Sequence, residues 1–340
     1  MQIIYALMKG WERMPGMQDV ANVAGVSIAT VSRVINNVGN VLPETASKVL
    51  QAMEALQYKP SFAVHSQRNA RNKVILAIFP EFINPFWGDI LEGMDATARS
   101  SGCTLITCAS HSDVHQELRG LNMLKEKQVD GVILLSSVLS EDELDEWNRQ
   151  YPILLCCEYE ENTHLSYVSV NYKDAAYQGI TYLIRMGHKR IALISSASRS
   201  NSILQKEAGY KQALADCGIS FDPALLVNGS YQYESGYEKG LALMQIVDPP
   251  TAIMTISDTA AAGCLCAIYE SGKRCPQDVA ILGFDNMILS RMLYPPLTTV
   301  GIQKRRMGGT AVKMLLDRIS GDTTHRCLLL PHEIVVRQSV

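Results

Sequence analysis

Short apolar runs alternate with amphipathic stretches of helical length along most of this chain, in two successive series. The first series has apolar runs at 74–79, 104–109, 131–135 and 153–157, separated by helical patterns around 88–101, 113–127 and 141–149. The second has a helix through 187, apolar runs at 191–195, 252–255 and 279–283, and helical patterns at 203–217 and 259–271. Apolar strands joined by crossover helices form parallel, doubly wound sheets. The alternation therefore predicts two α/β subdomains of similar size, with a ligand cleft at the carboxyl ends of their strands.

The composition is that of an ordinary globular protein. The 340 residues are 47% hydrophobic and 19% charged, which excludes wholesale disorder and fibrous architectures. No uninterrupted apolar run reaches the roughly 18 residues that a membrane span requires. The first eight residues lack the basic start and the small-residue cleavage site of a signal peptide. We therefore expect a cytoplasmic protein.

Nine cysteines are spread through the apolar stretches, with no CxxC pair and no histidine cluster at metal-ligand spacing. This pattern indicates reduced thiols in a cytosolic protein, and neither a disulfide framework nor a zinc site. Cys156 and Cys157 are adjacent in an apolar run, where successive side chains point to opposite faces, so we expect no bridge between them. The sequence predicts no metal and no cofactor.

The N-terminal sixty residues have a different pattern, that of three short helices. Asp19 can cap a first helix, which Gly25 ends. Ser27 can cap a second helix over 28–36, and a third helix over about 43–57 has a proline in its first turn. A helix, a tight glycine turn, a second helix and a supporting helix form the helix-turn-helix plan of DNA-binding proteins.

One face of the second helix carries small and hydrogen-bonding side chains. Ile28 and Ala29 can contact apolar base surface such as a thymine methyl group. Arg33 and the hydroxyls of Ser27 and Ser32 can reach bases or phosphates. A plain three-helix packing unit with solvated serine and arginine side chains fits the helix spacing equally well.

Charge is divided unevenly along the chain. Residues 1–73 carry eight Lys or Arg against four acidic residues, whereas residues 74–340 carry 23 basic and 30 acidic residues. A small basic head on an acidic body is the layout expected when only the head contacts a polyanion.

The run DVANVAGVSIATVSRVIN at 19–36 resembles the DNA-binding head of the lactose-repressor/galactose-repressor (LacI/GalR) family, and LQYKP at 56–60 fits the end of that head. The resemblance implies that Ile28 and Ala29 form the main specificity pair. It also assigns further contacts with bases and phosphates to Thr30, Ser32, Arg33 and Asn36.

The linker that follows departs from the family pattern. In the family this segment usually folds into a hinge helix on operator binding, and a leucine there enters the minor groove and kinks the DNA. This chain has Gln67 at the wedge position and His65 where arginine is common. Because glutamine can hydrogen-bond in the groove but unstacks bases poorly, we expect a weaker bend or a more flexible hinge.

The resemblance covers residues 17–338 and implies the fold of the periplasmic sugar-binding proteins. We expect a helix-turn-helix domain at 17–59, a hinge at 60–73, and an effector-binding and dimerisation domain at 74–340. Within the last domain, we expect one subdomain at about 74–171 and 303–320, and the other at about 172–302 and 321–340. Residues 1–16 precede anything in the family, and we interpret them as an extension, with Met14 favoured as the true start.

Seven residues are candidates for contact with an effector. Phe86 and Trp87 lie at a strand-to-helix turn, where aromatic faces can stack on a sugar or base ring, although they also fit ordinary core positions. Asp258 and Asp285 follow strand ends, where a carboxylate can accept hydrogen bonds from hydroxyls or cap a helix. The resemblance adds three pocket positions, Ser202, Lys206 and Tyr231.

Two of the pocket positions depart from the common pattern of the family. Lys206 replaces a commonly seen arginine, so the planar bidentate fork is lost. Asn171-Tyr172 stands where the family mostly has Asp-Asn. We therefore expect an effector other than one bound by the commonest sugar pattern.

Two other classes of protein fit the body less well. An enzyme would need chemistry that the sequence lacks, since it has no GxGxxG after the first strand, no Walker P-loop and no GxSxG elbow. A secreted solute-binding protein would need an export signal and would have no DNA-binding head. We expect a transcription regulator, most simply a repressor. It would bind a near-palindromic operator as a homodimer and respond to a carbohydrate or nucleoside in the interdomain cleft.

Overall fold

The computed structural model describes residues 16–35, 41–56, 58, 73–159, 163–198 and 200–340. The chain divides into two compact units at residue 71: an N-terminal head and a larger body, and each is described by itself. No helix among the described residues is long and apolar enough to cross a membrane. Residues 1–15 of the expected N-terminal extension and residues 60–72 of the expected hinge, Gln67 included, lie outside the described residues, as does Asn36.

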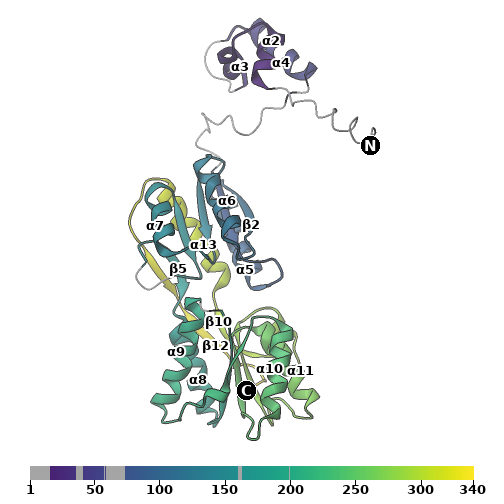
Figure 1. Ribbon diagram of the computed structural model, residues 1–340, viewed down its shortest axis with the longest axis vertical. Coiled ribbons are helices and arrows are strands. Elements are labelled where there is room, and N and C mark those ends of the chain that lie inside the picture. The colour runs from purple at the N-terminus through teal and green to yellow at the C-terminus, as the bar shows by residue number, and fades with distance from the viewer. Residues whose placement is uncertain (1–15, 36–40, 57, 59–72, 160–162, 199) are drawn as a thin grey trace, which may run out of the picture. The chain divides into compact units, whose positions relative to one another are not determined.

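The head contains the three predicted helices, α2 (Met17–Ala24), α3 (Ile28–Ile35) and α4 (Pro43–Ala55) (Figure 1). Gly25 ends α2 in the left-handed conformation, with φ +66°, which costs glycine little. The Ser27 hydroxyl accepts a hydrogen bond of 3.1 Å from the Thr30 N–H and so caps α3, as predicted. A small apolar core holds the helices together, and its fully buried members are Val20, Ala21, Val31, Val49 and Ala52.

The first subdomain of the body is a six-stranded, all-parallel sheet in the order β11-β5-β4-β3-β1-β2. Its strands are β1 (Val74–Phe79), β2 (Thr104–Ala109), β3 (Gly131–Leu134), β4 (Ile153–Cys156), β5 (Tyr167–Val170) and β11 (Cys327–Leu330). Its helices are α5 (Phe86–Ser100), α6 (Val114–Lys125), α7 (Glu141–Gln150) and α13 (Lys304–Ile319).

The second subdomain repeats this plan in the order β12-β10-β9-β8-β6-β7, with only β12 antiparallel. Its strands are β6 (Ile191–Ser196), β7 (Leu226–Gly229), β8 (Ala252–Thr255), β9 (Ala280–Asp285), β10 (Thr298–Ile302) and β12 (His332–Val335). Its helices are α8 (Tyr172–Arg185), α9 (Asn201–Asp216), α10 (Tyr233–Gln245), α11 (Asp258–Glu270) and α12 (Leu289–Met292), with a short 3-10 turn at Pro223–Leu225.

The two sheets correspond strand for strand, so the helices that follow β1 and β6 (α5 and α9) are equivalent, as are those that follow β3 and β8 (α7 and α11). The chain passes between the subdomains after β5, after β10 and after β11.

The assignment of all of residues 321–340 to the second subdomain was wrong. β11 pairs in parallel with β5 at the edge of the first sheet, from Cys327 opposite Tyr167 to Leu330 opposite Val170. Only β12 belongs to the second sheet. The chain therefore stays with the first subdomain after α13 and crosses back near residue 331.

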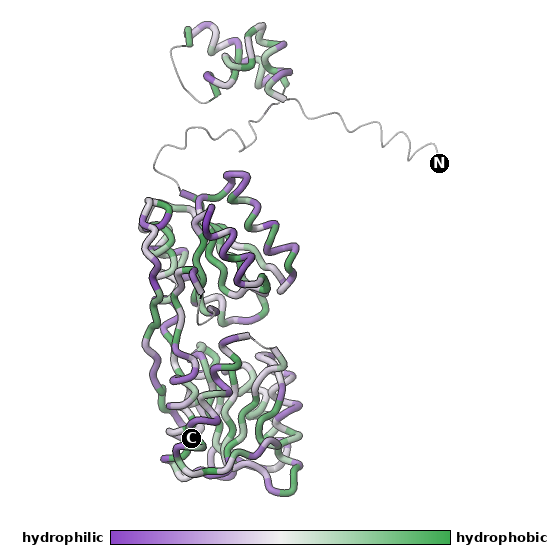
Figure 2. Tube along the Cα trace, turned by 60° about the vertical axis from the view of Figure 1, so that its left-hand side comes forward, coloured by the Kyte–Doolittle hydropathy of each residue, from purple (hydrophilic) through white to green (hydrophobic). Residues whose placement is uncertain are grey.

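Alternating strand residues serve two helical layers, which is why the apolar runs are continuous. In β1, Ile75 and Ala77 pack with α5 and α13, whereas Leu76 and Ile78 pack with α6 and α7. Figure 2 shows the hydrophobic strands enclosed by helices whose outer faces are hydrophilic.

Corresponding glycines allow two helix pairs to approach closely. A Cβ atom on Gly93 of α5 would lie 2.0 Å from the Arg305 carbonyl oxygen of α13. A Cβ atom on Gly209 of α9 would lie 2.1 Å from the Lys173 carbonyl oxygen of α8. Both contacts position a helix whose N-terminus reaches the edge of its sheet where the subdomains meet.

Candidate functional site

A cavity of about 320 Å³ lies between the carboxyl edges of the two sheets, with walls from both subdomains. Six of the seven predicted effector residues line it: Phe86, Trp87, Ser202, Lys206, Tyr231 and Asp285. They come from equivalent places in the two halves, since Phe86 and Trp87 begin α5, whereas Ser202 and Lys206 lie in the first two turns of α9. We call it the inner cavity.

The first subdomain supplies an aromatic wall. The Asn84 side-chain oxygen accepts a hydrogen bond of 3.1 Å from the Phe86 N–H at the start of α5. The Phe86 and Trp87 rings meet edge to face, with centroids 4.8 Å apart. Trp87 Nε1 is buried and has no hydrogen-bond partner among the described residues. A buried donor of this kind is costly unless a bound molecule accepts from it.

The second subdomain supplies a buried cation. Lys206 is only 3% exposed, and its ammonium lies 4.5 Å from the Phe284 ring centroid, 4.9 Å from that of Tyr172 and 5.6 Å from that of Tyr231. These distances are within the range of cation–π attraction. Burial lowers the pKa of Lys206, while the negative charges of Asp285 and Glu158 act in the opposite direction.

Asp285 ends β9 with φ +100°, and Cys157, which directly follows the equivalent strand β4, has φ +78°. Both residues line the inner cavity. Non-glycine residues rarely adopt such angles, and strained positions of this kind gather at ligand sites. Burial raises the pKa of the Asp285 carboxyl, and the charges of Lys206 and Lys304 oppose that increase.

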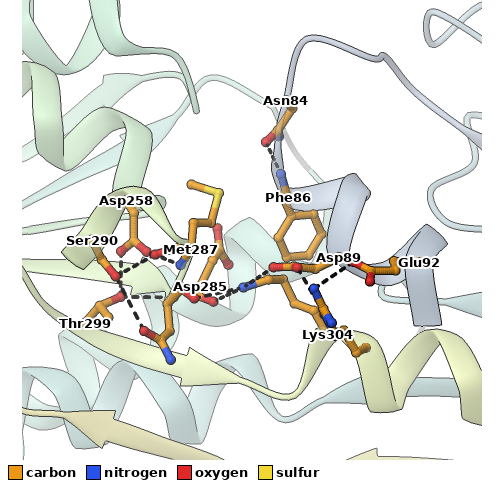
Figure 3. Close-up of polar contacts among 12 residues, drawn as sticks. Asn84, Phe86, Asp89, Glu92, Asp258, Asp285, Met287, Ser290, Thr299 and Lys304 are labelled. Carbon is orange, nitrogen blue, oxygen red and sulfur yellow. Dashed lines mark hydrogen bonds and ion pairs between the residues drawn. The ribbon is translucent and has the colours of Figure 1, made fainter. Parts of the chain in front are cut away.

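Lys304 connects the two subdomains beside the cavity (Figure 3). From α13, its ammonium donates to the Asp285 carbonyl and, at 3.2 Å, to the Asn286 carbonyl. It also lies 3.5 Å from a carboxylate oxygen of Asp89 on α5. A buried charge with partners in both halves makes the local geometry depend on the position of each subdomain.

Asp258, the seventh predicted residue, is not among the residues that line the inner cavity, and it is not the cap of its helix. Ser257 caps α11, accepting at 3.1 Å from the Ala260 N–H. The fully buried Asp258 carboxylate instead accepts from the Met287 N–H and the Thr299 hydroxyl, each at 2.6 Å (Figure 3). Burial, together with the charge of Asp285, raises its pKa to about 7. It supports the segment that carries Asp285.

Sequence reasoning missed several residues of the cavity. Glu158 lies just after β4, and its carboxylate accepts from both the backbone N–H (3.1 Å) and the hydroxyl of Ser202 across the subdomain boundary. A carboxylate at the N-terminus of α9 is electrostatically favourable. The position of Glu158 directly after the fourth apolar run could have marked it as a cleft residue. The other missed residues include Glu81, His111, Ser136 and Ser200, whereas Tyr172, which the sequence analysis placed at a pocket position, does line the cavity.

Further hydrogen bonds cross between the subdomains at the cleft. Gln232 donates to the Glu81 carboxylate at 3.1 Å, and the Asn201 amide donates to the Tyr159 carbonyl. A molecule in the cleft therefore contacts two bodies whose separation is already controlled by a few polar contacts.

The predicted DNA-contacting residues of the head lie on and before α3. Ser27, Ile28, Ala29 and Arg33 are exposed, whereas Thr30 and Ser32 are half-buried. Ile28 is 42% exposed although Val31, one turn further along, is completely buried. An exposed isoleucine beside small polar residues fits the apolar contacts that helices make in the major groove.

Comparison with known proteins gives matches over both units. Residues 16–61 match the family described as bacterial regulatory proteins, lacI family, and residues 180–340 match the periplasmic binding protein-like domain. Catabolite control protein A of Priestia megaterium is 33% identical over 324 residues, which cover 94% of this chain and 98% of that protein.

The chain belongs to the lacI family of regulators.

Solved structures agree with this assignment over nearly the whole chain. The lac repressor dimer bound to operator and the anti-inducer ONPF has a TM-score of 0.75 and 26% identity, covering 96% of this chain and 99% of that one. The complex of the transcriptional regulator CelR with cellobiose has a TM-score of 0.72 and 29% identity, covering 96% and 100%. The lacI-family chain is thus a transcriptional repressor that binds operator DNA under the control of a small-molecule effector, and it is not an enzyme.

Proposed function

We propose that this regulator binds a near-palindromic operator as a homodimer, with α3 of each head in the major groove of one half-site. Ser27, Ile28, Ala29, Thr30, Ser32, Arg33 and Asn36 would make the contacts. One small head offers few base contacts, so useful specificity requires paired half-sites. Since its target is DNA, we infer that it acts in the cytoplasm, at the nucleoid.

We further propose that the effector is a carbohydrate or a nucleoside and that it binds in the inner cavity. The observation that carries this proposal is the pairing of an aromatic wall from one subdomain with buried polar groups, Lys206 and Asp285, from the other. The cellobiose complex of CelR supports the carbohydrate alternative.

The effector would act by changing the angle between the subdomains. A ligand that touches both walls has different contact energies in the two arrangements, which is the requirement for shifting a two-state equilibrium. The change would reach the heads through the hinge at 60–73. There, Gln67 would bend DNA less than leucine does, and an unchanged bend angle in Gln67→Leu would refute that part of the proposal.

The test is selection of random duplex DNA on the purified protein, with and without a panel of sugars and nucleosides. An enriched palindrome that one compound abolishes or strengthens is the expected result. Sedimentation of the protein–DNA complex gives the number of chains per site. The absence of a palindrome under every condition would overturn the paired half-site proposal.

The role of α3 has its own test in Ala29→Asp. Ala29 is exposed, so folding should be unaffected, while a carboxylate facing DNA should remove a contact at both half-sites. At about 1–3 kcal/mol for each contact, operator affinity should fall by at least about 30-fold. Gln51→Asp on the exposed surface of α4 is the control. An equal loss of operator affinity in the two variants would contradict the proposal that α3 contacts the DNA bases.

A further inference from the structure

A second cavity, of about 570 Å³, adjoins the inner one, and we call it the outer cavity. Ser136, Glu158 and Ser200 line both cavities, so the two spaces are contiguous. Its walls come from β3, β4 and α7 of the first subdomain and from Ser200 and Asn201 at the start of α9 of the second. Small-molecule sites commonly measure about 300–1,000 Å³. The inner cavity alone is at the lower end of that range, and the pair offers room for a longer molecule.

The outer cavity contains a buried acceptor that the protein does not satisfy. Glu141 is the first residue of α7 and lines this cavity. Its Oε1 atom is buried and has no hydrogen-bond partner among the described residues. Such atoms are uncommon in folded proteins, and an ordered water or a bound molecule is the usual missing partner. The inner cavity has the matching feature in Trp87 Nε1, a buried donor.

The equivalent acid of the other subdomain shows that this is not a general property of the fold. Asp258 is the first residue of α11, which corresponds to α7, and each helix is capped by a serine, Ser257 or Ser140. Asp258 receives hydrogen bonds from Met287 and Thr299. Glu141 lines the outer cavity and has a buried oxygen without a partner among the described residues, whereas the Asp258 carboxylate is satisfied by its own chain.

The charges of the combined cavity define the kind of molecule that it accepts. Of the described residues that line either cavity, Lys206 is the only lysine or arginine, whereas Glu81, Glu141, Glu158 and Asp285 are acidic. A phosphate or carboxylate group would be desolvated beside like charges, at a high cost in free energy. Ligand hydroxyls, by contrast, donate to carboxylates and exchange hydrogen bonds with the serine hydroxyls of the outer cavity.

We propose that the outer cavity is a second sugar subsite and that the effector is a two-ring saccharide without a phosphate group. One ring occupies the inner cavity between the Trp87 wall and Lys206. The other occupies the outer cavity, where Glu141 and Glu158 accept from its hydroxyls. This inference rests on the proposed effector function of the inner cavity and adds the size and charge of the ligand.

The experiment measures binding by calorimetry to the full-length protein. The probes are cellobiose, maltose, trehalose, melibiose and sucrose, with glucose, galactose and fructose as their single-ring counterparts. Glucose 6-phosphate and trehalose 6-phosphate supply the anionic arm, and adenosine and cytidine supply the nucleoside arm. We expect one disaccharide to bind at least about 10-fold more tightly than its component sugars and than either phosphosugar.

Two variants locate the second ring. Glu141→Trp fills the outer cavity and should weaken the best disaccharide by at least about 10-fold while changing its component monosaccharide by less than 2-fold. Glu141→Gln retains the shape and should weaken the disaccharide by a smaller factor. Asp142→Trp is the control, because it lies in the same helical turn, removes the same charge and is exposed outside the cavity.

The outcomes separate this inference from the proposed function. A monosaccharide, nucleoside or phosphosugar that binds as tightly as any disaccharide, with no effect of Glu141→Trp, overturns the second subsite and leaves the effector role of the inner cavity intact. Equal weakening in Glu141→Trp and Asp142→Trp also overturns it. No binding by any probe counts against both proposals.

Discussion

The two subdomains have the same strand order, yet they contribute different chemistry to the cleft. The start of α5 in the first supplies the rings of Phe86 and Trp87, whereas the start of α9 in the second supplies Ser202 and the buried cation of Lys206. The fold therefore fixes where the side chains of the site emerge, and the residues at those positions decide what each half contributes. A ligand needs both halves to satisfy it, which couples binding to the angle between the subdomains.

The acids that begin α7 and α11 extend the comparison to stability. Glu141 faces a cavity, whereas Asp258 is buried against Met287 and Thr299. We propose that the first acid contacts the ligand, while the second holds the backbone next to Asp285. Under that proposal, the same position serves binding in one half and folding in the other.

The largest effect on effector binding is expected from Lys206→Met, which removes the buried cation that the second subdomain contributes to the inner cavity. A hydrogen bond between the ligand and a charged group contributes about 1.5–3 kcal/mol, so loss of the buried Lys206 ammonium should lower effector affinity by at least about 10-fold. Without the ammonium, the pKa of Asp285 should rise further, and its carboxyl becomes a poorer acceptor. Calorimetry measures the affinity, and operator binding without effector should be unchanged.

The matched control is Lys211→Met on the same helix, where the lysine is exposed. Equal effector affinity in the Lys206 and Lys211 variants would show that the cation of the second subdomain does not belong to the site.

The next effect is expected from Asp258→Asn, which should change how the free energy of unfolding depends on pH. The pKa of Asp258 is about 7 in the folded protein and about 3.9 when unfolded, so the folded state binds more protons between these values. Wild-type stability should therefore fall as pH rises from about 4 to 7, by roughly 4 kcal/mol from this group alone. Asparagine does not titrate, so the variant lacks this fall.

Urea unfolding at pH 5 and pH 8 checks this prediction. The stability advantage of the wild type over Asp258→Asn should be larger at pH 5 and smaller at pH 8. Parallel pH profiles would contradict the assignment of a protonated, structural acid to the second subdomain. Effector affinity at pH 8 should change much less than in Lys206→Met.

The smallest effect is expected from Trp87→Phe in the aromatic wall. The substitution retains a ring but removes the Nε1 donor, and one hydrogen bond contributes about 0.5–1.5 kcal/mol. Effector affinity should fall about 2- to 12-fold, with no loss of stability because the donor has no partner among the described residues of the protein. A more stable protein with unchanged effector affinity would show that the donor does not meet the ligand.

Much of the fold followed from local pattern. The apolar runs at 74–79, 104–109 and 252–255 are strands with the predicted bounds, and Gly25 and Ser27 end and begin helices as predicted. The strands β5, β7, β10, β11 and β12 were not predicted. Of these, β7, β11 and β12 are partly exposed edge strands, so they lack the continuous burial of the central strands. Sequence position alone could not assign β11 to the first sheet.

The sequence by itself determined the class of each unit. Helix caps, glycine turns and apolar periodicity depend on neighbours within a few residues, so they define the head, the two doubly wound subdomains and the resemblance to the lacI family. Only the tertiary structure distinguished Asp285 from Asp258 and brought Glu158 and Glu141 to the cleft. Burial and hydrogen-bond partners depend on segments that are distant in sequence and meet at the sheet edges, such as Ser202 with Glu158 and Thr299 with Asp258, and no local pattern contains that information.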